Sequence, residues 1–190
     1  AHHLLMVADA VAGEFAAAID HAWHAYLCAR GNATLESAAL GNVGQVLLDA
    51  GHPAIARMAF RAVIRRRAPA RIVLPALGGT AVAAARLGDG ELLERTRLEM
   101  DACANAGAAP YDVASACLDL ARAYAAMHDR PRTAELRSRA MQLARAHGFY
   151  EIEHHADLLM KEMAEAPPVE RALPPWIETM AGALRELAAV

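Results

Sequence analysis

The chain has 190 residues, of which 56% are hydrophobic and only 5% aromatic, and its net charge is −3 at pH 7. Its apolar runs end at a charged residue or a glycine well before the roughly 18 residues that a membrane-spanning helix needs, and no segment resembles a signal peptide. These features exclude a membrane span and are typical of a soluble, cytoplasmic protein.

The composition also predicts the fold class. Alanine has the best helix propensity, and the sequence lacks the β-branched stretches of alternating polarity that mark strands. We therefore expect an all-α protein whose helices pack closely around a core of Ala, Leu, Val and Met.

The cysteines and the single lysine indicate where the protein is located. Cys28, Cys103 and Cys117 are odd in number and form no CxxC pair, which predicts reduced thiols packed on helix faces. Lys161 is the only lysine among many arginines, a bias typical of GC-rich bacterial genomes. Both features favour the cytoplasm of a bacterium.

Glycines recur along the chain at a nearly constant interval. Gly13, Gly51 and Gly88 lie about one repeat apart, and His128 takes the equivalent position in the next repeat. Each of these residues is expected to form the tight corner between two antiparallel helices. The chain should therefore contain consecutive helical hairpins.

The second hairpin is the clearest. Its small residues Gly44 and Ala56 are expected where the two helices approach most closely. Val43, Leu47 and Phe60 supply the bulk around them. Because one hairpin cannot bury its apolar face alone, neighbouring hairpins must stack on it.

The first hairpin matches this pattern well, with Phe15 and Ala18 after its corner. The third is degenerate, because Leu93 and Arg97 stand where an alanine and an aromatic residue are expected. The sequence still predicts a helix, a corner and a helix in both copies.

The fourth hairpin restores Leu120, Ala121 and Tyr124 before its corner. One residue is expected to be inserted between this corner and Ala134. A further helix is expected over about 150–164. It has the position of the first helix of a fifth hairpin, but the second helix of that hairpin is missing.

The spacing of these residues resembles the tetratricopeptide repeat (TPR). The resemblance implies a right-handed α-solenoid of about four repeats plus C-terminal capping helices. We expect the repeat array over 1–165, a proline-rich linker over 166–175, and a C-terminal amphipathic helix over 176–190.

The C-terminal helix has an apolar stripe that must be covered. We favour a cap on the helix at 150–164; alternatively, the stripe lies in a groove of its own chain, or of a second copy, which would give a homo-oligomer. The first repeat begins without a capping residue, so a fragment of a longer protein is expected. The stripe consists of Ile177, Met180, Ala181, Leu184, Leu187 and Ala188.

The TPR resemblance also implies a partner site on the concave face, which the first helix of each hairpin lines. TPR domains that clamp a C-terminal carboxylate use Lys, Arg and Asn there. Lysine is missing here, and Asp49 and Asp119 would repel an anion, so we expect a different protein or peptide partner; the alternative is an ordinary solvated face. The predicted partner-binding residues are Asn42, Gln45, Asp49, Arg86, Asp119 and Arg122.

Arginines repeat along the second helix of the second hairpin. Because the chain is acidic overall and the row lacks interleaved aromatic residues, we interpret it as a solvated convex face and predict no direct nucleic-acid binding. The row consists of Arg57, Arg61 and Arg65, extended by Arg66, Arg67 and Arg71.

Histidines form the one cluster that resembles a metal site. Glu151 and His155 lie one helical turn apart, with His147 in the preceding turn. Zinc needs three or four ligands, and the HExxH order is absent, so we predict no metal and no cofactor. His21 and His24, which flank Trp23, are likewise read as a surface pair.

No GxSxG elbow, Walker A loop or dinucleotide-binding glycine pattern occurs, so no catalytic residue is predicted. The repeats are similar to the C-terminal helical regions of large bacterial transcriptional regulators. We therefore predict a non-catalytic protein–protein interaction scaffold of a regulatory or signalling protein. The alternatives are a sensor domain that binds a peptide or small molecule in its superhelical groove and, more weakly, a metal-binding sensor or enzyme.

Overall fold

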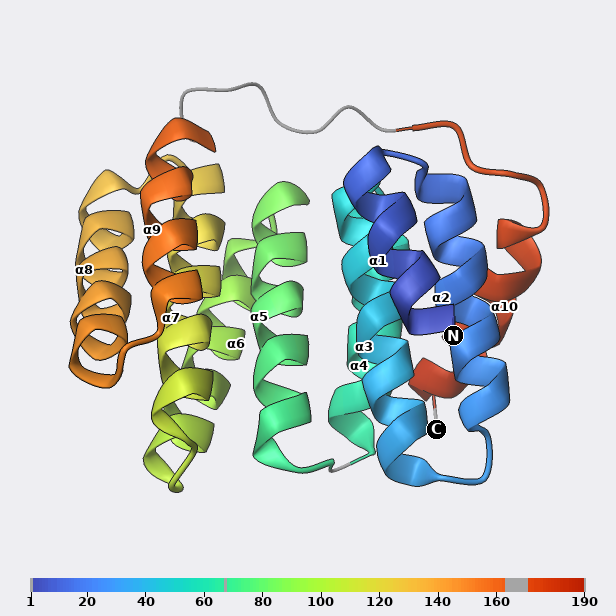
Figure 1. Cartoon of the computed structure of the whole chain (residues 1–190), viewed down its shortest axis with the longest axis horizontal. Coiled ribbons are helices and arrows are strands. Elements are labelled where there is room, and N and C mark those ends of the chain that lie inside the picture. Colours follow the sequence, from blue (N-terminus) through green and yellow to red (C-terminus); the bar gives the residue numbers. More distant parts are fainter. Residues whose placement is uncertain (1, 67, 163–170, 190) are drawn as a thin grey trace. The chain divides into compact units, whose positions relative to one another are not determined.

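The computed structural model describes residues 2–66, 68–162 and 171–189. These residues form ten helices and no strand, which confirms the all-α prediction (Figure 1). None of the described helices is both long enough and apolar enough to cross a membrane. The helices are α1 (His2–Ala12), α2 (Phe15–Ala29), α3 (Ala33–Asp49), α4 (Pro53–Arg65), α5 (Ala70–Arg86), α6 (Gly90–Asn105), α7 (Pro110–Ala126), α8 (Arg130–His147), α9 (Tyr150–Glu162) and α10 (Ile177–Ala189).

The chain divides into two compact units. The first contains Ala1–Ala76 with Pro168–Val190, so the first and the last helix belong to the same unit (Figure 1). The second contains Leu77–Pro167. The division falls inside α5, directly after the turn that holds Pro75, a residue with no N–H for the helical hydrogen-bond ladder. Residues 163–170 lie outside the described residues, and they include the first half of the predicted linker, 166–170.

The corners of the four hairpins have the same geometry. At each corner the backbone N–H donates to the carbonyl three residues earlier, and the next N–H donates to the carbonyl five residues earlier, at 2.8–3.1 Å. The φ angles are +80° at Gly13, +87° at Gly51, +72° at Gly88 and +60° at His128. This hydrogen-bond pair ends a helix when its last residue is left-handed. The predicted corner positions, His128 included, are therefore confirmed.

The first unit is built on the close approach of α3 and α4. A Cβ atom on Gly44 would lie 2.5 Å from the ring of Phe60, so only glycine fits at this crossing. Ala56 is fully buried beside it, and Val43 and Leu47 are fully buried in the core. The predicted roles of these residues in the second hairpin are confirmed.

The predicted insertion in the fourth hairpin is wrong. Ala134 is exposed, and Thr133 instead occupies the buried position five residues after the corner. Threonine is tolerated there because its hydroxyl donates to the carbonyl of Asp129 at 2.7 Å. No insertion is needed, because the same position is held by Ala18, Ala56, Leu93 and Thr133 in the four hairpins.

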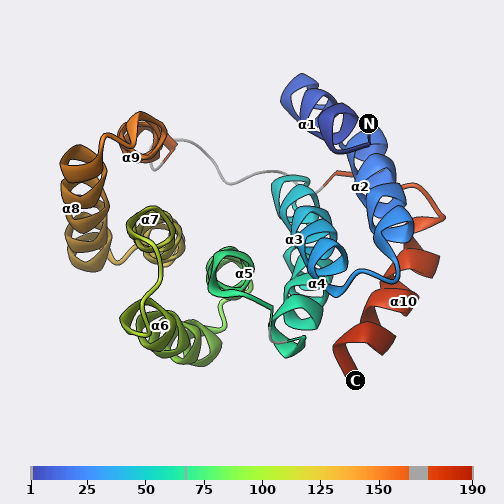
Figure 2. The same cartoon turned by 60° about the horizontal axis from the view of Figure 1, so that its bottom comes forward.

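In the second unit, α7, α8 and α9 pack around one apolar cluster (Figure 2). Phe149 packs against this cluster from the connection between α8 and α9. Half of its buried members are alanine, whose small side chain lets the helices lie close together. Its buried members are Ala114, Cys117, Leu118, Ala121, Ala140, Met141, Ala144, Ile152, Ala156 and Leu159.

Helix α10 packs on α4, in the first unit. The favoured expectation, a cap on the helix at 150–164, is therefore wrong: the apolar stripe of α10 is covered by a helix far earlier in the chain. Arg65 on α4 donates to the carbonyl of Ala189 at 2.7 Å and holds the end of α10. Five of the six predicted stripe residues are buried: Ile177, Met180, Ala181, Leu184 and Ala188.

Candidate functional site

Three of the predicted partner-binding residues lie along α3 in the first unit. Gln45 Nε2 donates to Asp49 Oδ1 at 2.9 Å, and Asn42 Nδ2 lies 3.3 Å from Nδ1 of His3 on α1. Asn42 is half-buried, and the other three residues are exposed. The structure thus brings these residues together with His3, which the sequence analysis did not include. His3, Asn42, Gln45 and Asp49 are called the α3 row below.

The other three predicted residues belong to the second unit. Asp119 and Arg122 form an ion pair of 3.2 Å on α7. A Cβ atom on Gly78 of α5 would lie 2.9 Å from Cγ of Asp119, so this carboxylate rests against the α5 backbone. Arg86 is half-buried in the last turn of α5. Because Arg122 is already paired with a carboxylate, it is not an open anion clamp.

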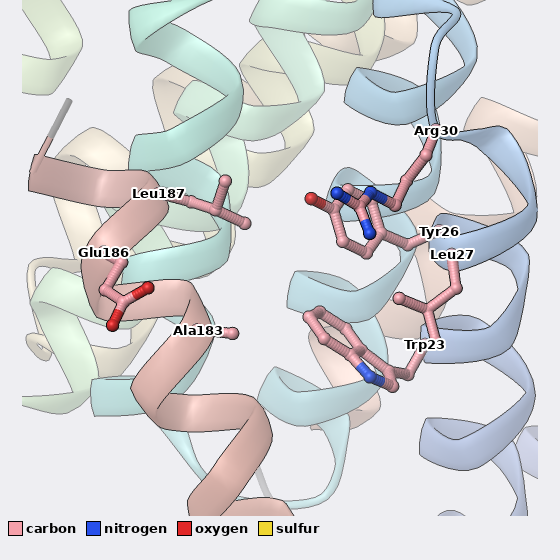
Figure 3. Close-up of a pocket in the computed structure, with 7 residues that line it drawn as sticks. All are labelled: Trp23, Tyr26, Leu27, Arg30, Ala183, Glu186 and Leu187. Carbon is pink, nitrogen blue, oxygen red and sulfur yellow. The ribbon is translucent and has the colours of Figure 1, made fainter.

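A groove that the sequence analysis missed lies between α2 and α10 in the first unit (Figure 3). Its volume is about 390 Å³. The sequence signal for this groove is weak. It consists of two aromatic residues spaced three apart in a chain with few aromatic residues. The opposite wall of the groove comes from the other end of the chain, so the sequence does not link the two walls. The groove is lined by Trp23, Tyr26, Leu27 and Arg30 on α2 and by Ala183, Glu186 and Leu187 on α10.

Most of the groove wall is apolar, and its aromatic part is contiguous. The rings of Trp23 and Tyr26 are 4.9 Å apart between centroids and tilted by 35°. Figure 3 shows the Tyr26 hydroxyl pointing from α2 toward Leu187 on α10. Leu187 is the one predicted stripe residue of α10 that is not buried, because it lines this groove.

Histidines from α1 and α2 meet at one end of the first unit. The Nδ1 atoms of His2 and His21 are 3.3 Å apart, and His2 stacks on His24 with ring centroids 5.6 Å apart. His21 also lies 3.6 Å from Asp9, and His24 lies 3.3 Å from Asp20. The predicted surface pair of His21 and His24 is therefore part of a larger helix contact.

The residues of the weaker metal hypothesis are engaged in other contacts. His147 stacks on Phe149 with ring centroids 5.4 Å apart, and Glu151 accepts a hydrogen bond from Tyr111 at 3.2 Å. His155 lies beside His154, with ring centroids 6.0 Å apart. Within residues 2–66, 68–162 and 171–189, no three His, Cys, Asp or Glu side chains are grouped as metal ligands would be.

An electrostatic cluster in the second unit joins α6, α7 and α8. Tyr124 donates to Glu94 Oε1 at 2.7 Å, Arg97 donates to Glu94 Oε2 at 3.1 Å, and Arg132 also bonds Glu94. The hydrogen bond from Tyr124 is the main cause that lowers the pKa of Glu94. Burial and the nearby carboxylate raise the pKa of Tyr124. Each side chain of the cluster is hydrogen-bonded or ion-paired to another member. Such a cluster stabilises helix packing and does not activate an acid or a base.

Two arginines of the predicted basic row make internal contacts. Arg66 pairs with Glu36 of α3 at 2.8 Å, and Arg65 bonds the end of α10. Arg61 and Arg71 are exposed, and Arg67 lies outside the described residues. Part of the row therefore serves packing within the first unit.

The TPR resemblance rests on the spacing of residues in the sequence. Comparisons with protein-family models, with curated proteins and with solved structures found no match.

Proposed function

We propose that the chain is a non-catalytic, TPR-type protein–protein interaction scaffold that serves a bacterial regulatory or signalling protein, and that its hairpins stack as a right-handed α-solenoid. The observation that supports this proposal most is the repeated corner, which has one hydrogen-bond pattern at four equivalent positions. Repeats of one hairpin type present their first helices on a continuous surface, which these architectures use to bind partners.

The α3 row is the proposed contact surface. It combines the amides of Asn42 and Gln45, the carboxylate of Asp49 and the imidazole of His3. Together these groups donate and accept hydrogen bonds, so they match the alternating N–H and C=O groups of a peptide backbone. The row carries no fixed positive charge, so a peptide recognised mainly by its C-terminal carboxylate is a poor match.

A display selection tests this proposal. The wild-type chain is used to select binders from a random peptide library, and each binder is then titrated against the Asn42→Ala and Gln45→Ala variants. We expect each substitution to weaken binding about threefold to tenfold, because each removes hydrogen bonds worth about 0.5–1.5 kcal/mol.

The control is Arg61→Ala, an exposed change on α4. The proposal fails if no peptide is selected, or if the selected peptides bind the two α3 variants as well as they bind wild type and Arg61→Ala. Circular dichroism of each variant separates lost contacts from lost structure.

The α2–α10 groove favours a second candidate function, a sensor domain. Its volume of about 390 Å³ falls within the range of roughly 300–1,000 Å³ that is usual for small-molecule sites. A thermal-shift screen of a metabolite library tests this candidate. A metabolite that raises the melting temperature of wild type, but not of a Trp23→Ala variant, would support it.

A further inference from the structure

Helix α1 carries three exposed apolar residues, which are called the α1 row below. They are 74%, 43% and 85% exposed, in the order Leu4, Val7 and Val11. They stand nine, six and two residues before the corner at Gly13. The α3 residues of the α3 row stand at the same three distances before the corner at Gly51: Asn42, Gln45 and Asp49. The two rows are therefore equivalent by position, but one is apolar and the other polar.

The equivalence places the α1 row on the surface that contains the α3 row. Because the two corners share one geometry, equal distances from the corner select the same face of the first helix. Gln45 and Asp49 stay exposed although α3 packs on both α2 and α4. Leu5 is not counted in the row, because its equivalent Val43 is fully buried.

The side chains of the two helices meet on this surface. Nδ1 of His3 on α1 lies 3.3 Å from Nδ2 of Asn42 on α3, and Leu4 directly follows His3 in the chain. The apolar row thus begins beside the polar one. A ligand that lies on the α3 row also reaches the α1 row.

The size of the α1 row indicates the kind of partner. A stable interface between folded proteins uses about 20–30 residues on each side. The α1 row has only three side chains on a helix of 11 residues, and polar groups of the α3 row border it. A patch of this size matches a short peptide and is too small to hold a second copy of the chain.

The length of the α1 row suits an extended segment. Leu4 and Val11 are seven positions apart, which corresponds to about 10 Å along the helix. In an extended peptide every second side chain points to the same side, and two such side chains are about 7 Å apart. Two apolar residues separated by one residue therefore fit on the α1 row.

The charges of the two rows exclude acidic partners. Asp49 is their only carboxylate, and neither row contains arginine or lysine. An acidic peptide would meet no cation with a fixed charge and would be repelled by Asp49. The surface therefore matches a neutral or basic segment.

We propose that the α1 row selects the sequence of the peptide that the α3 row holds. The partner is a short, extended, neutral or basic segment with two apolar residues separated by one residue. The α3 row bonds its backbone, and the α1 row contacts its apolar side chains. This assignment rests on the proposed function, because it takes the α3 row as the surface that binds the backbone.

The test compares two synthetic probes of the same composition, KGLSLSG and KGLLSSG. Both are amidated and carry a fluorescein at the N-terminus, so fluorescence anisotropy measures their binding. The leucines point to the same side of an extended chain in the first probe and to opposite sides in the second. We expect the first probe to bind at least threefold more tightly than the second.

A triple variant removes the apolar character of the α1 row without adding charge: Leu4→Asn, Val7→Gln and Val11→Asn. It should weaken binding of KGLSLSG about tenfold and abolish the preference between the probes. Leu98→Asn is the matched control, because Leu98 is 58% exposed on α6 of the second unit. Circular dichroism checks the helix content, and Leu4→Asn alone repeats the test at one exposed position.

Three results would overturn the proposal: no saturation with KGLSLSG up to about 1 mM, equal binding of the two probes, or equal binding by the triple variant. A wild-type dimer in light scattering that the triple variant converts to a monomer would also overturn it, because a second copy would then cover the α1 row. If Asn42→Ala and Gln45→Ala weaken binding of the selected peptides but the triple variant does not, the proposed function stands and only the role of the α1 row fails. If the triple variant weakens KGLSLSG binding and the two α3 variants do not, the α1 row binds the peptide without the α3 row, and the α3 row fails as the contact surface.

Discussion

The carbonyl oxygen of Arg171 lies 2.7 Å from Nε2 of His52, although 119 residues separate them. Since a carbonyl only accepts, the Nε2–H of His52 donates. The Arg171 guanidinium also donates to the carbonyl of Gly13 at 3.0 Å and lies 4.4 Å from the ring centre of Phe15. One residue thus contacts the corners of both hairpins in the first unit and fixes the approach to α10.

Substituting Arg171→Ala should lower the free energy of unfolding by about 1 kcal/mol, because an exposed cation–π contact and a charged hydrogen bond are lost. Urea denaturation followed by circular dichroism measures this change. Arg185→Ala is the matched control, since Arg185 is exposed on α10 and makes no described polar contact. An effect of equal size in both variants would show that the contacts of Arg171 contribute nothing.

Two glycines of α3 should respond to alanine in opposite ways. Gly44→Ala places a methyl group 2.5 Å from the Phe60 ring, and overpacking of this kind costs about 1–3 kcal/mol. Gly41 has nothing within 4 Å of the same position, so Gly41→Ala should raise stability by about 0.5–1 kcal/mol through helix propensity. Thermal denaturation of the two variants checks the prediction.

A second change tests the cause of the Gly44→Ala effect. Phe60→Leu shortens the side chain that faces Gly44, so the double variant should lose less stability than the two single changes added together. Additive losses would mean that the ring of Phe60 is not what excludes a side chain at Gly44.

The corners could be predicted from the sequence because their requirement is local. A left-handed residue favours glycine, so Gly13, Gly51 and Gly88 mark it directly, and the interval then locates His128. Thr133 was misread because its hydroxyl bonds the backbone of its own helix, a contact that makes a polar residue acceptable in a buried position.

The position of α10 and the groove could not be predicted. An apolar stripe shows that a helix must be covered, but not which helix covers it. Trp23 and Ala183 lie on facing walls of the groove and belong to opposite ends of the chain. The polar contacts of the α3 row were likewise invisible, because Asn42 meets His3 from another helix.

The fourth corner stores strain that glycine would relieve. His128 has a φ of +60°, a conformation that costs an ordinary residue about 1 kcal/mol, and its exposed side chain makes no hydrogen bond, ion pair or ring contact with a described residue. His128→Gly should therefore raise the melting temperature. Gly88→Ala is the reverse change. A Cβ atom at Gly88 would have no neighbour within 4 Å. The expected loss of about 1 kcal/mol in the free energy of unfolding would therefore come from the backbone conformation alone. If His128→Gly lowers stability, the left-handed corner is not strained.

The three thiols should differ in reactivity. Cys28 is exposed on α2, whereas Cys117 lies 5% exposed in the apolar cluster of the second unit. Burial raises the pKa of the Cys103 and Cys117 thiols and lowers their thiolate fraction. A disulfide reagent at about pH 8 should therefore label the Cys28 thiol quickly and the other two thiols slowly. Cys28→Ser should remove this fast phase, and a fast phase that persists would contradict the protection of Cys103 on α6 and Cys117 on α7.

The Glu94 cluster predicts a pH dependence in the acid range. Its hydrogen bond from Tyr124 lowers the pKa of Glu94 below the usual value near 4.5. A carboxyl group with a lowered pKa in the folded state contributes stability above its unfolded pKa and loses that contribution as the pH falls through the folded pKa. Glu94→Gln should cost about 1 kcal/mol at neutral pH, a modest figure because the side chain is 40% exposed and screened by solvent.

The difference between wild type and Glu94→Gln should shrink as the pH falls below about 4.5, because protonation then removes the same charge from the wild type. Urea denaturation in a series of buffers on both sides of this pH measures the difference. Glu91→Gln is the control, since Glu91 is exposed on the same helix and makes no described ion pair. A difference that stays constant across the series would mean that the charge of Glu94 does not stabilise the packing of α6, α7 and α8.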